Sequence, residues 1–120
     1  MVNGRTKNLK MDKRIYGLRR EVMGYIYEAK EVVEMPRITV RITDNHESML
    51  GCALMEKDVI WITERAIHEY DLRSIVFHEI AHAVFGADHD EDCPLMKSSI
   101  KRTERLSKTK CQQILKKIRG

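Results

Sequence analysis

The segment from Asp71 to Gly86 constrains the fold of this chain more than any other segment. Its apolar residues recur at intervals of three and four, the period of a helix, and form one broad face: Leu72, Ile75, Val76, Ile80, Ala83 and Val84. Asp71 is a suitable N-cap, and Gly86 can adopt the left-handed conformation that ends a helix. The segment therefore predicts a helix whose broad face packs against the core.

The flanking segments predict the partners of this helix. A chain of 120 residues forms one domain. The other predicted elements are a helix from about 13 to 34 that Pro36 ends, an alternating strand over 37–44, short strands over 50–55 and 59–63, and a last helix capped by Ser107. Residues 1–12 are expected to form a flexible arm, followed by a single domain over 13–120. The predicted fold class is α+β, with helices against a small sheet.

The composition excludes two broad classes of protein. With 42% hydrophobic and 33% charged residues, the chain is too apolar to be disordered and too charged for a membrane protein. No apolar run approaches the ~18–20 residues that a spanning helix needs. Three cysteines, an odd number, argue against a disulfide framework. Because no secretory leader is recognisable either, we expect a cytoplasmic protein without a membrane partner.

Positive charge is concentrated towards the C-terminus. Residues 97–120 contain nine basic residues and one acidic residue, Glu104, which sum to +8. The whole chain carries +4, so residues 1–96 sum to −4. Two interpretations of this basic segment are open. It forms a solvated helix face, or it forms a contact surface for nucleic acid or an acidic partner. No aromatic residue interrupts the basic ones, which argues against stacking on single-stranded nucleic acid.

Residues 78–82 carry the clearest chemical signal, His-Glu-Ile-Ala-His, on the predicted central helix. Positions four apart lie about 40° apart around a helix, so His78 and His82 can converge on one ion. Neutral imidazoles suit zinc. Glu79 lies about 100° further round and is better placed to accept a proton from an activated water than to bind the metal. This is the mechanical reason for the H-E-x-x-H spacing of zinc hydrolases.

A third ligand is expected just after the helix. Gly86 would let the chain reverse and bring a later residue back towards the metal. His89 is the best candidate by ligand type. Asp88 and Asp90 are neighbours that could bind instead, or could hold an imidazole N–H.

The pattern His78-Glu79-x-x-His82-x-x-x-Gly86-x-x-His89 resembles the signature of the metzincin zinc peptidases, H-E-x-x-H-x-x-G-x-x-H, with one additional residue before the glycine. The segment Cys93-Pro94-Leu95-Met96 is similar to their Met-turn, and the C-terminal helix is similar to that of matrixin-type domains. The resemblance covers about residues 36–120, in a short chain close to the archaemetzincins. It implies a zincin-like fold, in which a small mixed sheet packs on an N-terminal helix and an active-site helix, with a C-terminal helix.

The resemblance also implies a function, that of an endopeptidase. One Zn²⁺ would be held by His78, His82 and His89, and Glu79 would be the general base for hydrolysis of a peptide bond. Met96 would form the floor of this site.

A peptide or protein substrate would lie extended along an edge strand of the sheet. The expected edge strand is the one that contains Ile60, Trp61 and Ile62.

Three other functions stay open. Small bacterial zinc ribonucleases have a similar H-G-x-x-H-x-x-G-x-x-H pattern, with an acidic residue after the third histidine, as in His89-Asp90; Glu79 in place of their glycine favours the peptidase. A DNA-associated protease could use the basic C-terminal helix. A binding module without catalysis would need a fourth protein ligand, such as Cys93, to close the coordination sphere of a structural zinc.

Overall fold

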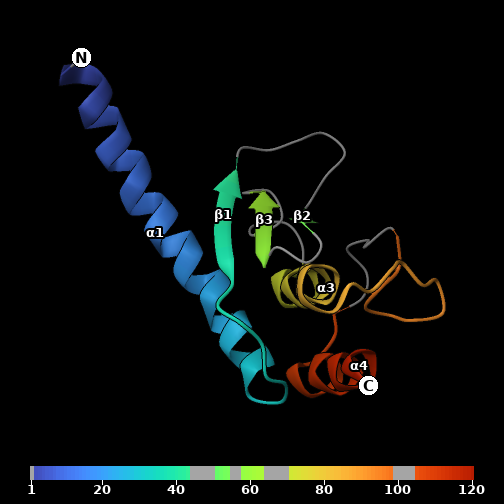
Figure 1. The fold of residues 1–120 in the computed structure, drawn as a ribbon. Helices are drawn as coiled ribbons and strands as arrows, with labels where there is room; N and C mark the ends of the chain where they lie inside the picture. The colour runs from blue at the N-terminus through green and yellow to red at the C-terminus, as the bar shows by residue number, and fades with distance from the viewer. Residues whose placement is uncertain (1, 44–50, 55–57, 64–70, 99–104) are drawn as a thin grey trace.

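The computed structural model describes residues 2–43, 51–54, 58–63, 71–98 and 105–120. Within these ranges the chain is α+β, as predicted. The helices are α1 (Val2–Lys30), α3 (Leu72–Phe85) and α4 (Lys108–Arg119), and the strands are β1 (Thr39–Thr43), β2 (Gly51–Leu54) and β3 (Val59–Thr63). Figure 1 shows the sheet on one side of α3 and α4 on the other, with α1 running past both. No described helix is long and apolar enough to cross a membrane.

The sheet is mixed, with the strand order β1–β3–β2. β1 runs parallel to β3, and Arg41 is the partner of Trp61. β2 runs antiparallel to β3, and Cys52 is the partner of Trp61 on that side. Alternation places Ile60 and Ile62 on the face that packs against the helices, where both are fully buried, whereas Trp61 is 39% exposed on the opposite face.

The strand order corrects the prediction that Ile60, Trp61 and Ile62 form an edge strand for substrate. β3 is the central strand, and β1 and β2 occupy both of its edges. Its backbone is therefore unavailable to an added peptide. The sequence pattern correctly identified a strand, but strand order depends on which segments pair in space, and periodicity within one segment contains no information on that pairing.

α3 is the central helix and matches its predicted bounds. Asp71 is the N-cap, and Gly86 is the C-cap with φ 64°, in the left-handed region. The next residue, Ala87, donates its N–H to the carbonyl of Ala81 over 3.0 Å. The helix contacts α1, α4, β2 and β3. This central position explains why its apolar face is so broad, and why Phe77 is among the largest fully buried side chains.

α1 starts earlier than the sequence predicts. Its predicted apolar stripe is buried from Leu18 through Ala29, as expected. However, the helix begins at Val2, so most of the segment assigned to a flexible arm, residues 1–12, is helical. Figure 1 shows this end extending away from the rest of the molecule. Residues 2–12 have no apolar stripe at helical spacing, and periodicity detects only helices with a face to bury.

Polar contacts at Glu28 join the three helices of the described part of the chain. The carboxylate of Glu28 accepts hydrogen bonds from Nε (2.8 Å) and Nη2 (3.2 Å) of Arg73 on α3. Its backbone carbonyl accepts a hydrogen bond from Nε2 of Gln112 on α4 over 2.9 Å. Since α3 carries the predicted metal ligands, Glu28 helps to set the position of the site relative to the other two helices.

Candidate metal centre

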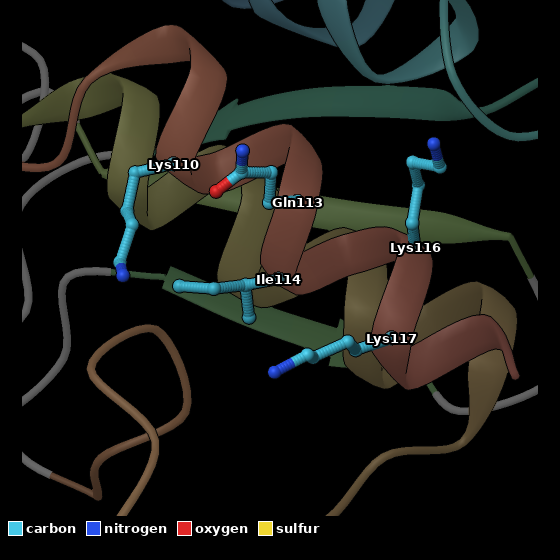
Figure 2. Close-up of a pocket in the computed structure, with 5 residues that line it drawn as sticks. All are labelled: Lys110, Gln113, Ile114, Lys116 and Lys117. Atoms are coloured by element: carbon cyan, nitrogen blue, oxygen red, sulfur yellow. The ribbon is translucent and has the colours of Figure 1, made fainter.

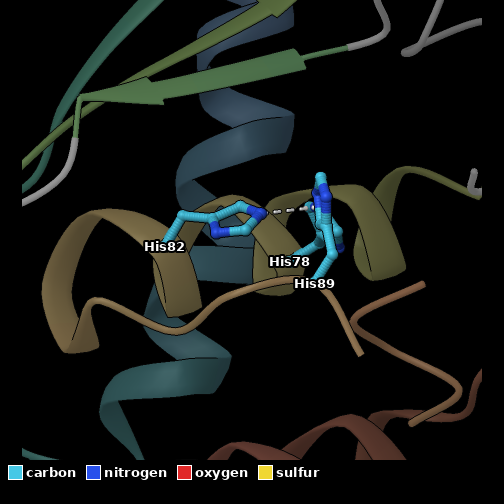
Figure 3. Close-up of side chains that lie close together, drawn as sticks. All are labelled: His78, His82 and His89. Atoms are coloured by element: carbon cyan, nitrogen blue, oxygen red, sulfur yellow. Dashed lines mark hydrogen bonds between the residues drawn. The ribbon is translucent and has the colours of Figure 1, made fainter. Parts of the chain in front are cut away.

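Three histidines converge beside α3. His78 and His82 lie one turn apart on the helix, and their Nε2 atoms are 3.1 Å apart. The chain reverses after Gly86, which places His89 beside these two histidines. The ring centroid of His89 lies 5.3 Å from the ring centroid of His78 and 4.8 Å from that of His82. Figure 3 shows the three rings pointing towards one another. One ligand atom from each lies within 4.8 Å of the others, so the three histidines can hold a metal ion.

Backbone carbonyls orient two of the imidazoles. Nδ1–H of His78 donates to the carbonyl of Leu95 over 2.7 Å, and Nδ1–H of His82 donates to the carbonyl of Ala87. A carbonyl can only accept, so Nδ1 carries the proton in each of these hydrogen bonds, and Nε2 is the nitrogen that faces the cluster and can offer a lone pair to a metal. Such second contacts fix the tautomer and the ring direction of metal ligands.

The spacing of these lone pairs fits a tetrahedral cation. Two nitrogens at ~2.05 Å from a tetrahedral zinc ion lie about 3.3 Å from each other. The observed separation of 3.1 Å between Nε2 of His78 and Nε2 of His82 is close to that value.

Binding of a metal ion also requires that the imidazole ligands are neutral. Burial lowers the pKa of His78 from 6.5 to about 4, with a smaller contribution from the neighbouring His82 and His89, so this ring is neutral at physiological pH.

Glu79 directly follows His78 in the chain and is not a member of this cluster. Its side chain is buried on α3, at 6% exposure. Burial raises the pKa of Glu79 from 4.5 to about 7, because a carboxylate loses its hydration there. A general base is most effective when its pKa lies near the working pH. The raised pKa of Glu79 therefore suits proton transfer near neutral pH, and its role as a general base stays a prediction.

The structure also distinguishes between the alternative ligands. In the described part of the chain, the metal-ligand cluster contains His89 and neither Asp88 nor Asp90. Asp90 is engaged elsewhere: its N–H donates to the carbonyl of Met96 over 2.8 Å, and its Oδ1 accepts from the N–H of Asp92 over 2.9 Å. Cys93 is likewise outside the cluster. Among the described residues the cluster thus offers three ligands, which is the number that catalytic zinc sites take from the protein while a coordination position stays open.

A tight turn over residues 93–96 supports the site. The N–H of Met96 donates to the carbonyl of Cys93 over 3.0 Å. Leu95 and Met96 are buried in the core, and the turn directs the carbonyl of Leu95 at His78. Sequence reasoning selected Met96 here and missed Leu95. The contribution of Leu95 is made by a backbone carbonyl, which every residue has, so no side-chain signal could have identified it.

Comparisons with protein-family models, with curated proteins and with solved structures find no match to this chain. Its chemistry is therefore inferred from the arrangement of the site. That arrangement comprises three convergent imidazoles, two of them held by backbone carbonyls, and one buried carboxylate on the same helix.

Proposed function

We propose that this protein is a zinc-dependent endopeptidase with a zincin-like fold. The convergence of His78, His82 and His89 beside the buried Glu79 is the observation that carries the proposal. Three nitrogen ligands with an open position suit catalytic zinc, whereas harder cations such as Mg²⁺ and Ca²⁺ prefer oxygen ligands. The resemblance of the His78–His89 segment to the metzincin signature supports the same conclusion.

Each residue has a distinct task in this proposal. Zinc, when bound, polarises a carbonyl and makes water a better nucleophile at neutral pH. Glu79 accepts the proton of the water that attacks the peptide carbonyl, and returns it to the nitrogen of the departing amine. The carbonyls of Leu95 and Ala87 keep His78 and His82 in the ligating tautomer. Met96 is a buried part of the support beneath this segment.

The revised strand order suggests where a substrate binds. β2 is an outer strand of the described sheet and contacts α3, the helix that carries His78 and His82. Figure 3 shows the sheet lying over the three histidines. We infer that an extended peptide adds to β2 through main-chain hydrogen bonds, because an outer strand has backbone groups free for pairing. In this arrangement the peptide runs past the metal centre.

The proposal is tested by separating metal binding from hydrolysis. The wild-type protein should bind one zinc ion per chain and cleave an unstructured protein substrate. Glu79→Gln should retain zinc and lose cleavage by at least about a hundredfold, the scale of a general base. His82→Ala should lose both. Asp88→Asn, which changes an exposed carboxylate one residue from His89, is the matched control and should retain both.

Two results would refute the peptidase. One is full cleavage by Glu79→Gln, which would remove the general base from the mechanism. The other is stoichiometric zinc without peptide cleavage but with metal-dependent cleavage of RNA, assayed in the same preparations. The second result would instead identify the ribonuclease.

A further inference from the structure

α4 presents two chemically different faces. Its apolar side chains Cys111, Ile114 and Leu115 are buried against the body of the protein. Its lysines 108, 110, 116 and 117 and Arg119 are exposed, and the helix contains no acidic residue. Ser107 caps the helix by accepting a hydrogen bond from the N–H of Lys110 over 3.1 Å. The basic face is therefore held in place by a helix that is firmly docked on its other side.

A shallow groove of about 400 Å³ runs along this basic face. It is lined by Lys110, Gln113, Ile114, Lys116 and Lys117. Figure 2 shows Lys110 and Lys117 on either side of Ile114. Lys110 and Lys117 are seven residues apart, or about 10 Å along a helix axis. That distance equals the rise of about three nucleotides along one strand of a duplex.

The lysines of the groove form no ion pair with the residues that the structure describes. In the described part of the chain, the one ion pair of α4 joins Nζ of Lys108 to the carboxylate of Glu31 over 3.0 Å. Lys110, Lys116 and Lys117 have no carboxylate partner among the described residues. Their positive charges are therefore available to an external anion, and they add to one another over a short distance.

We propose that this face of α4 binds duplex nucleic acid through its phosphate backbone. Lysines act as point charges towards phosphate, and such contacts require no base recognition. A membrane surface fits less well, because an amphipathic helix binds lipid with a free apolar face and the apolar face of α4 is buried. Single strands fit less well because the groove has no aromatic side chain for bases to stack on. This inference goes beyond the peptidase proposal and does not depend on the metal centre.

The test measures binding of a fluorescent 20-base-pair DNA duplex by anisotropy as a function of salt. If the three groove lysines each neutralise one phosphate, the slope of log K against log salt is about −2.7, and affinity falls about 40-fold between 50 and 200 mM salt. The variant Lys110→Gln/Lys116→Gln/Lys117→Gln should lose most of this affinity and of the salt dependence. All three positions are exposed, so the variant should fold, which its thermal unfolding would verify.

The matched control removes the same charge from α1, with Arg19→Gln/Arg20→Gln/Lys30→Gln at three exposed positions. This control should bind the duplex like the wild-type protein. Three results would overturn the proposal: no binding of the duplex, equal losses in the two triple variants, or equally tight binding of polyglutamate or of phosphatidylserine vesicles. Because Glu79→Gln and metal removal should leave duplex binding unchanged, failure here is distinguishable from failure of the peptidase proposal.

Discussion

Replacing Glu28 by glutamine tests whether its contact with Arg73 stabilises the packing of α1 against α3, the helix that carries His78 and His82. The carboxylate of Glu28 accepts two hydrogen bonds from the guanidinium of Arg73, at 2.8 and 3.2 Å. The side chains are only 29% (Arg73) and 17% (Glu28) exposed. Glutamine has nearly the same shape, but its amide group turns a donor towards Arg73 and removes the negative charge. The backbone hydrogen bond from Gln112 to residue 28 is preserved.

The expected loss follows from these contacts. Hydrogen bonds to charged groups contribute about 1.5–3 kcal/mol, and a partly exposed pair lies towards the lower end, so Glu28→Gln should lower the free energy of unfolding by about 2 kcal/mol. With an unfolding entropy of about 2.1 cal/mol/K per residue, the melting temperature of this chain should fall by about 8 °C. Urea titration followed by circular dichroism measures the first quantity, and a thermal melt measures the second.

Glu31→Gln provides the control, one residue beyond the C-terminal end of the same helix. Its carboxylate pairs with Lys108 at 3.0 Å, but both side chains are about half exposed, at 53% and 46%. An exposed pair of this kind contributes about 0–1 kcal/mol, so the control should shift the melting temperature by a few degrees at most. Equal losses in the two variants, or a loss from Glu28→Gln below about 0.5 kcal/mol, would refute the conclusion that burial makes the Arg73 contact important.

Three further predictions concern the site and the core. In a Cys52→Ser background, Cys93 should react with a thiol reagent at pH 8 much faster than Cys111, because burial raises the pKa of Cys111 to about 11. Mass spectrometry of the labelled peptides measures the two reaction rates, and equal rates would contradict the prediction. Zinc at a hundred times its Kd should raise the free energy of unfolding by about 2.7 kcal/mol in the wild-type protein and not in His82→Ala, as a denaturant titration would show. In the metal-free protein, the pKa of Glu79 is raised from 4.5 to about 7, so its stabilising contribution is complete below pH 4.5 and is lost as the pH rises towards 7. Glu79→Gln should therefore become progressively more stable than the wild-type protein over that interval, by up to about 3 kcal/mol above pH 7, and a difference that does not change with pH would contradict this.

Local chemistry in the sequence determined the individual elements and the ligand spacing. The bounds of α3 followed from Asp71, Gly86 and a period of 3.6 residues, all within one segment. The start of α4 also followed from one segment, because the hydroxyl of Ser107 caps the helix by accepting a hydrogen bond from the N–H of Lys110, three residues later. The convergence of His78 and His82 is a property of helix geometry, since residues four apart share a face. These features need only short-range geometry, which is why they could be predicted.

Contacts between distant segments were decided only by the tertiary structure. The central position of β3 depends on its pairing with both β1 and β2. The orientation of His78 depends on the carbonyl of Leu95, 17 residues away. The ion pair between α1 and α3 depends on Arg73 meeting Glu28, 45 residues away. A backbone carbonyl has no sequence signature, because every residue has one. A charged side chain has many available partners in the sequence. The partner that it contacts is decided when the buried faces of the helices and the sheet pack together.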